Sequence, residues 1–186
     1  MLPIHIEQVE MYNDITQEFS YIGPKQPMDL MLEHSLYSIA KWESKYHKFY
    51  VDSEKTPEEV LDYFSMMVVG QEVDPSIFLA LKEEDILKIK AYIDDPMTAT
   101  VISEDDSKKV KGRNRKMSAE LVYYWMTALN IPFECQYWHF NRLITLIRVC
   151  SIESDPDKNK KKKKFSTADM VARRAKMEAA RAKYKH

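Results

Sequence analysis

The sequence predicts a mainly α protein, built as a compact helical bundle around a central apolar helix over residues 134–152. Only three of the 186 residues are glycine, which leaves little capacity for tight turns and favours helix. Apolar residues make up 45% of the chain and charged residues 31%, as in an ordinary globular protein. Within residues 134–152 apolar side chains occupy nearly every helical face, so this helix is expected at the centre of the core.

The N-terminal part is expected to add a small β ribbon to the bundle. Apolar and polar residues alternate from Ile4 to Met11, which is the period of a half-buried strand. A second stretch with period 2 runs over residues 28–32, and a helix is expected from about residue 34 to residue 50. The two strands could pair with each other as a ribbon.

Helix start signals are clear in the middle of the chain. Residues 56–59, Thr-Pro-Glu-Glu, combine a capping hydroxyl, a proline at the first helical position and an acid at the third, so a helix should begin there and stop near Gly70. Residues 74–75, Asp-Pro, should open a short helix. Residues 83–93 should follow as an amphipathic helix that ends before Pro96.

Residues 97–116 are expected to form an irregular connection inside the domain. The stretch 98–102 could be a brief strand, but residues near 103–116 are too polar to pack and predict a mobile loop. Strong helical patterns resume at 117–130 and 134–152. The predicted structural core comprises five large apolar side chains: Trp42, Trp125, Trp138, Leu143 and Ile147.

Charge is divided unevenly along the chain. Residues 1–156 carry 26 acidic and 16 basic residues, a net charge of −10, whereas residues 157–186 carry 3 acidic and 12 basic residues, a net charge of +9. The sequence therefore predicts an acidic, mostly helical domain over 1–156 and a basic tail over 157–186. Such a molecule can associate head to tail with its own kind, or offer unlike surfaces to two partners.

The basic tail is the predicted partner-binding element. It begins with a lysine run, and residues 166–184 then have a helix-favouring composition that opens on a serine cap. The apolar stripe of this helix is thin, so it is expected to complete itself on a partner. The residues expected to make the contact are lysines of the run and methionines and arginines of the helix: Lys160, Lys161, Lys162, Lys163, Lys164, Met170, Arg173, Arg174, Met177 and Arg181.

Patterns that would carry catalysis or bind a metal are weak. Cys135 and His139 are spaced like zinc ligands on one helix face, but a structural zinc site needs about four ligands and no second pair accompanies them. A core cysteine and a hydrogen-bonded histidine are therefore favoured. No P-loop or dinucleotide fingerprint is present in the sequence, so we expect no catalytic residue, no metal, no cofactor and no enzyme.

Cysteine usage and hydropathy bear on the compartment. The chain has two cysteines without paired spacing, and it starts without a secretory pattern. No apolar run reaches the length needed to cross a bilayer. These features predict a soluble protein with free thiols in a reducing cytoplasm.

Two further groups of residues each have two interpretations. Asn141, Arg142 and Arg148 interrupt an apolar segment, and a salt bridge to a carboxylate such as Glu43 or Glu120 is favoured over the polar floor of a binding groove. Aromatic residues could instead form a stacking platform for single-stranded nucleic acid, but their helical spacing favours an aromatic core. That group is Trp42, Trp125, Trp138, Tyr123, Tyr124 and Tyr137.

Four segments of the chain carry a family resemblance. They are EHSLYSIAKWESKYHKFY (33–50), DPMTATVI (95–102), ELVYYWMTALNIPFECQYWHFNRLITLIRVCSI (120–152) and the basic FSTADMVARRAKMEAARAK (165–183). Together they resemble a family of small proteins encoded in the tail-morphogenesis region of tailed bacteriophages, whose members are similar to tail assembly chaperones. The resemblance covers nearly the full length of the chain.

The resemblance implies a non-enzymatic chaperone that binds the tape measure protein and helps tail tube protein assemble around it, in the cytoplasm of the host bacterium. The alternative is a virion structural protein, such as a neck or tail accessory subunit. Nucleic-acid binding through the basic tail is less favoured, because the −10 body repels phosphates. Homo-oligomerisation and retention in the virion stay open.

Overall fold

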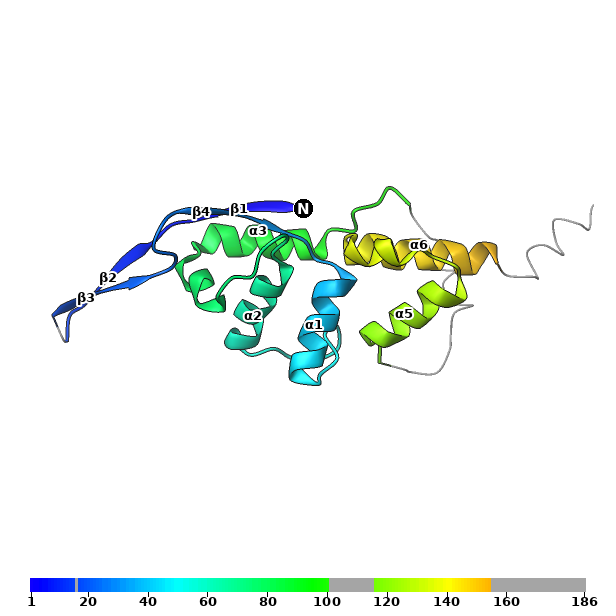
Figure 1. The fold of residues 1–186 in the computed structure, drawn as a ribbon, viewed down its shortest axis with the longest axis horizontal. Helices are drawn as coiled ribbons and strands as arrows, with labels where there is room; N and C mark the ends of the chain where they lie inside the picture. The colour runs from blue at the N-terminus through cyan, green and yellow to red at the C-terminus, as the bar shows by residue number, and fades with distance from the viewer. Residues whose placement is uncertain (16, 101–115, 155–186) are drawn as a thin grey trace, which may run out of the picture. The chain divides into compact units, whose positions relative to one another are not determined.

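A computed structural model describes residues 1–15, 17–100 and 116–154 of the chain (Figure 1). The chain divides into two compact units, residues 1–148 and 149–186. Of the second unit, residues 149–154 are described, and residues 149–153 end a helix. The predicted domain boundary at residue 156 lies outside the described residues and stays a prediction.

The predicted helical bundle around one central helix is wrong. About 50% of the described residues are helical and 17% lie in strands, which form two small antiparallel sheets. The helices pack in pairs and against the strands. Helix α1 (Leu36–Tyr46) contacts α2 (Pro57–Met67), and α3 (Glu83–Asp94) runs beside β1 (Leu2–Ile6), as Figure 1 shows.

The four strands belong to one long, interrupted β hairpin. Strand β1 pairs with β4 (Met28–Leu32), and β2 (Val9–Asn13) pairs with β3 (Glu18–Ile22). The single strand expected over residues 4–11 is thus two strands. Between the two sheets, two residues of the outgoing chain lie opposite five residues of the returning chain, an irregularity of the kind that bends a ribbon.

Gly23 allows the hairpin to bend at this irregularity. Its φ of +97° lies in the left-handed region, where glycine is favoured. A Cβ atom at this position would lie 2.7 Å from the Cβ of Ala80 and 3.0 Å from the carbonyl oxygen of Glu7. Ala80 ends the 3-10 helix η1 (Pro75–Ala80), which contacts β1 and β3. The hairpin therefore passes η1 at a distance that excludes any side chain at residue 23.

The predicted helix starts in the middle of the chain are confirmed. The hydroxyl of Thr56 accepts the N–H of Glu59, and the Glu59 carboxylate accepts the N–H of Thr56, which completes a capping box on α2. Asp74 caps η1, and α3 ends before Pro96. Helix α5 (Ala119–Ala128) begins after its cap, Ser118.

The end of α2 is joined to β4 by backbone hydrogen bonds. The N–H of Glu33 donates to the carbonyl of Met67 at 2.8 Å, and the N–H of Val69 donates to the carbonyl of Met31 at 2.9 Å. Residues 68–69 thus continue as an extended edge beside β4, so helix α2 stops before the expected Gly70. The ribbon and the first helix pair are held as one body.

The segment 134–152 is two helices and not the predicted central one. The 3-10 helix η3 (Phe133–Tyr137) ends at Trp138, whose backbone is extended at φ −73° and ψ 161°. Helix α6 (Phe140–Glu153) begins two residues later. Three side chains of α6 are buried, on one side of the helix: Phe140, Leu143 and Ile147.

Long-range hydrogen bonds interrupt the helix in this segment. His139 forms an isolated β-bridge with Ser35, and the N–H of Phe140 donates to the carbonyl of His34 at 2.7 Å. A continuous helix would use these backbone groups for its own i to i−4 bonds. The pairing with residues 34–35 is therefore incompatible with the predicted helix.

Of the predicted core residues, three are buried: Trp42, Leu143 and Ile147. Trp125 is half-buried. Trp138 is 37% exposed and is not a core residue, because the extended backbone between η3 and α6 places its ring at the surface, where the guanidinium of Arg142 lies 4.4 Å from the ring centroid. The indole N–H of Trp42 donates to the carbonyl of Glu59 at 3.0 Å and ties α1 to α2.

The predicted brief strand over 98–102 is absent from the described residues 98–100, and residues 101–102 lie outside the described part. The predicted mobile loop near 103–116 also lies outside it, apart from residue 116.

We expect Gly23→Ala to lower the free energy of unfolding by about 2–4 kcal/mol, because the new methyl group meets Ala80 in addition to the backbone strain. Gly70→Ala is the matched control: its φ is +85°, but nothing lies within 4 Å of the new Cβ, so about 1–2 kcal/mol of backbone strain is expected alone. Urea denaturation measures both. Equal losses in the two variants would contradict the close contact with η1.

Candidate partner-binding groove

A buried polar junction fixes the elements around the candidate site. It comprises Glu33, His34 and Ser35, which follow β4 and are all less than 9% exposed. The Glu33 carboxylate accepts the Tyr92 hydroxyl at 2.8 Å and lies 3.0 Å from the amino group of Met1. Buried polar groups must find such partners, and here the partners come from α3 and from the start of β1.

His34 is the central side chain of the junction. Its Nδ1 lies 2.6 Å from the hydroxyl oxygen of Tyr63. Burial, together with the nearby His139 and Lys55, lowers the His34 pKa to about 3, and burial raises the pKa of Tyr63 well above its usual value. The imidazole is therefore neutral at physiological pH, and a hydrogen bond joins its Nδ1 to the Tyr63 hydroxyl.

His139 joins the same junction from the other side. Its Nε2 lies 2.9 Å from the Tyr92 carbonyl oxygen, which can only accept, so the proton is on Nε2. The rings of His34 and His139 meet edge to face, with centroids 5.2 Å apart. The neighbouring Ser35 caps α1 and exchanges side-chain and backbone hydrogen bonds with Ser38. The junction thus orients α1, η3 and the end of α2 around a common surface.

A groove of about 490 Å³ opens on that surface. Its wall comes from the start of α1, the end of α2 with the extended residues that follow, and the last residue of η3. The lining residues are mostly methionine, valine and tyrosine: Met1, Glu33, Ser35, Tyr37, Lys41, Met66, Met67, Val68, Val69, Gly70, Gln71, Glu72 and Tyr137. Ligand-binding clefts in proteins typically have volumes of this order and mostly apolar linings.

Two tyrosines form one rim of the groove. The rings of Tyr37 and Tyr137 have centroids 5.3 Å apart, although they come from α1 and η3. Tyr37 is 40% exposed and Tyr137 is 55% exposed. The Lys41 ammonium lies 4.8 Å from the Tyr37 ring centroid and adds a positive charge to the rim. The rim can therefore contact a partner through aromatic faces.

Exposed aromatic side chains continue beyond the rim. Phe133 and Trp138 lie at the two ends of η3, and Tyr124 is 65% exposed on α5. The hydroxyl of Tyr123 donates to the Gln136 side chain at 2.8 Å, which holds η3 against α5. Large apolar side chains that stay exposed on two contacting elements are a feature of protein-interaction surfaces.

The predicted partner-binding residues of the basic tail, from Lys160 to Arg181, all lie outside the described residues. Asn141 and Arg142 do not meet the expected carboxylates. The Asn141 amide donates to the carbonyls of Ile93 and Asp95, and the Glu43 carboxylate accepts the N–H groups of Tyr50 and Ala119. Neither Asn141 nor Arg142 lines the groove.

The groove is not predictable from the sequence. Its lining comes from residues 1, 33–41, 66–72 and 137, which only the fold brings together. Two features of the sequence hint at exposed apolar groups. Tyr37 lies on the polar face of α1, and the apolar pair Val68-Val69 lies beyond the end of α2. Neither signal distinguishes a groove from ordinary packing.

The described residues offer little for chemistry. The Cys135 thiol is buried, and burial raises its pKa, so it is poorly suited to act as a nucleophile. Within the described ranges, no group of three or more His, Cys, Asp or Glu side chains could hold a metal ion.

None of the described helices is both long enough and apolar enough to span a bilayer.

Comparisons of the chain with known protein families, with characterised proteins and with solved structures find no significant match.

We expect the free energy of unfolding to fall as the pH is lowered from 6.5 towards 5, by up to about 1.4 kcal/mol per pH unit. The folded His34 pKa of about 3 lies below the unfolded value of 6.5, so in this interval the unfolded chain binds a proton that the folded chain does not. The contribution of the neutral His34 to the free energy of unfolding is fully present above pH 6.5 and is lost progressively as the pH falls towards 3. Urea denaturation at closely spaced pH values measures it.

His34→Asn should flatten this dependence between pH 6.5 and 5. His5→Asn is the control: hydrogen bonds to Asp29 and Glu7 raise the pKa of the exposed His5, so its removal should leave the fall in place or steepen it. An unchanged slope in the His34 variant would contradict a neutral, buried imidazole.

Proposed function

We propose that this chain is a non-enzymatic assembly chaperone of a phage tail, which binds the tape measure protein and helps tail tube protein assemble around it. The proposal rests on the resemblance of four segments to tail-morphogenesis proteins and on one structural observation, the groove lined by methionine, valine and tyrosine. Five of its thirteen lining residues lie in those segments, four in the first and Tyr137 in the third.

The groove suits a helical client. A tape measure protein is expected to expose a long apolar helical stripe before assembly, with anchors at i, i+3 and i+4. Helix-in-groove recognition places such anchors in an apolar cleft. Methionine side chains are unbranched and adapt to anchors of different shape, which fits a client whose stripe varies along its length. Met1, which is exposed, and Met66, which is half-buried, provide this adaptability here.

The charged groups at the groove suit a reversible contact. Lys41 stands on the aromatic rim, and Glu72 lies on the lining. Charges at the edge of an interface guide association and add little to affinity. A chaperone must release its client as the tail forms, so a contact of moderate area with a mixed rim is appropriate.

Tyr37→Ser combined with Tyr137→Ser should reduce capture of the client, because the pair forms the exposed aromatic rim of the groove. The measurement is co-expression with the tape measure protein, followed by the soluble fraction of that protein and its recovery with the chain. We expect a fall of about tenfold, equivalent to about 1.4 kcal/mol of binding free energy.

Leu79→Ser combined with Leu87→Ser is the matched control, since these side chains are 54% and 58% exposed and lie outside the groove. It should retain client capture. If the unaltered chain neither solubilises nor co-purifies with the tape measure protein or the tail tube protein, the proposal fails. Mass spectrometry of purified particles tests the alternative, because a virion structural protein would remain there at fixed stoichiometry.

A further inference from the structure

The ribbon of β2 and β3, residues 9–22, has an aromatic face that no part of the described chain covers. Cross-strand pairs place Tyr12 beside Phe19, and Glu10 beside Tyr21, on the same face of the ribbon. The three aromatic residues are between 51% and 61% exposed, and Ile15 at the turn is 93% exposed. In Figure 1 this ribbon extends beyond the helices.

Contacts within the ribbon order these side chains without burying them. The rings of Tyr12 and Phe19 have centroids 4.9 Å apart, and the Tyr21 hydroxyl donates to the Glu10 carboxylate at 2.8 Å. A two-stranded ribbon with solvent on both faces is marginally stable, and its outer edges are open to pairing. An ordered aromatic face on such a ribbon indicates a surface that is completed by a partner.

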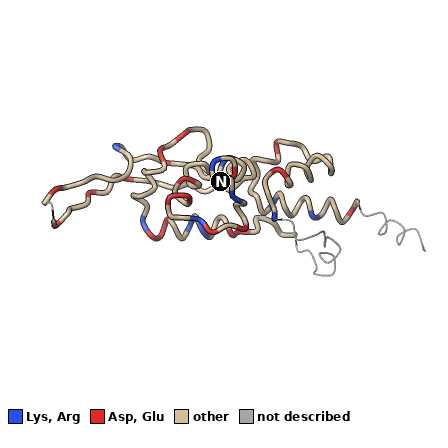
Figure 2. The backbone as a smooth tube through the Cα atoms, turned by 90° about the horizontal axis from the view of Figure 1, so that it is seen from below, with Lys and Arg blue, Asp and Glu red and all other residues tan. Residues whose placement is uncertain are grey.

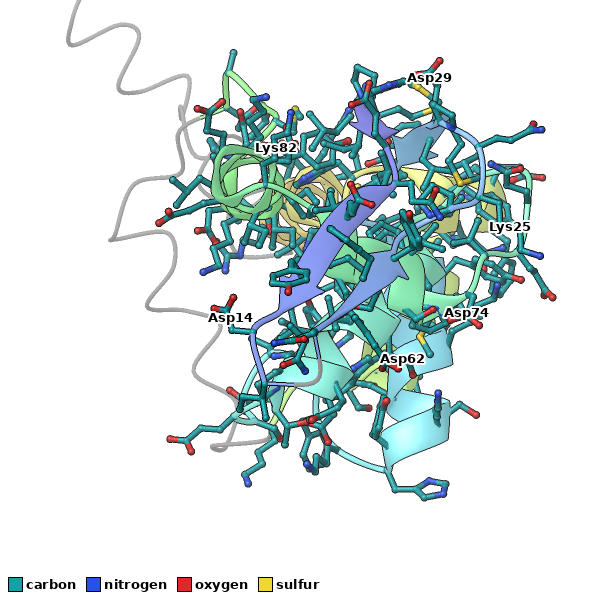
Figure 3. All side chains as sticks on the ribbon, turned by 90° about the vertical axis from the view of Figure 1, so that its left-hand side faces the viewer. Asp14, Lys25, Asp29, Asp62, Asp74 and Lys82 are labelled. Atoms are coloured by element: carbon teal, nitrogen blue, oxygen red, sulfur yellow. The ribbon has the colours of Figure 1, made fainter. Side chains whose placement is uncertain are left out.

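Charge identifies the chemistry of that partner. Residues 7–22 contain four acidic residues, Glu7, Glu10, Asp14 and Glu18, and no lysine or arginine. Glu10 lies on the aromatic face itself, and Glu18, which pairs with Asn13, lies on the opposite face of the same narrow ribbon. Figure 2 shows acidic positions and no basic position along β2 and β3, and Figure 3 shows Asp14 at the end of the ribbon. Aromatic faces next to carboxylates bind ammonium and guanidinium groups through both cation–π and ionic attraction. The ribbon therefore fits a basic segment that also carries some apolar side chains.

The chain contains such a segment outside the described residues. Residues 157–186 carry 12 basic and 3 acidic residues, together with Phe165, Met170, Met177 and Tyr184. We propose that the β2–β3 ribbon of one copy binds the basic segment 157–186 of a second copy. Every copy has both a ribbon and a basic segment. Each copy can therefore bind one neighbour through its ribbon and another through its basic segment, which links the copies head to tail.

Charge argues against the other occupants. A second ribbon would bring one segment with a net charge of −4 against another, and like charges repel at short range. Nucleic acid would bring phosphates against the same carboxylates. The contact uses neither the groove nor its rim, so it goes beyond the proposed chaperone activity, and the failure of one would leave the other standing.

Sedimentation velocity tests the contact by comparing the unaltered full chain, two charge variants and a mixture of those variants. The chain should self-associate at tens of micromolar in low salt and dissociate as salt is raised, because the attraction is ionic. Glu10→Lys with Glu18→Lys, which brings the net charge of residues 7–22 from −4 to 0, should weaken association, and so should Lys161→Glu with Lys163→Glu, which lowers the net charge of residues 157–186 from +9 to +5. A mixture of these two variants should associate again as pairs, because the unaltered basic segment of the ribbon variant then meets the unaltered ribbon of the segment variant. Monomeric unaltered chain, or no recovery in the mixture, would overturn the proposal.

Carbodiimide cross-linking of mixed ¹⁴N- and ¹⁵N-labelled full chains identifies which residues are in contact and whether they belong to the same copy or to two copies. We expect links from the lysine run to Glu10, Asp14 or Glu18 that join chains of different label. Tyr12→Ser with Phe19→Ser keeps every carboxylate and should reduce these links several-fold, whereas Leu79→Ser with Leu87→Ser should not. Links confined to chains of one label, or directed to carboxylates outside residues 7–22, would overturn the proposal.

Discussion

The hydrogen bond between the neutral imidazole of His34 and the hydroxyl of Tyr63 closes the junction at which the β hairpin, α2, α3 and η3 meet. A charged imidazole at this position would lose its hydration without gaining an anion, which is why burial lowers its pKa so far. The neighbouring backbone takes part as well, since the carbonyl of His34 accepts the N–H that starts α6. Helices α1, α2, α3 and α6 each contribute a group that is hydrogen-bonded at this junction.

The β hairpin positions both candidate surfaces, one at each of its ends. Where β4 ends at Leu32, the chain turns through Glu33 and His34 into α1, and this turn forms part of the groove wall. At the other end of the hairpin, the bend at Gly23 lets β2 and β3 leave the body beside η1. One continuous hairpin therefore supports an apolar groove near its base and an acidic aromatic face near its turn.

The two surfaces differ in the physics of binding. The groove offers apolar side chains with few charges and suits a contact whose free energy comes from burial. The ribbon offers exposed rings among carboxylates and suits a contact that depends on salt. The two surfaces share no residue, so the two proposed contacts do not compete for the same side chains.

Local patterns determined what depends on a few neighbouring residues. The capping box at Thr56, the cap at Asp74 and the strand over residues 28–32 were all predictable, because each rests on hydrogen-bond partners or periodicity within a few positions. The charge division was also given by the sequence alone. The helix over 134–152 was not: its apolar pattern is continuous, but the pairing of His139 with Ser35, about a hundred residues away, takes the backbone groups that the helix needed. The tertiary structure likewise decided the exposure of Trp138, and it assembled the groove from four separate stretches of chain, because only long-range packing brings their side chains together.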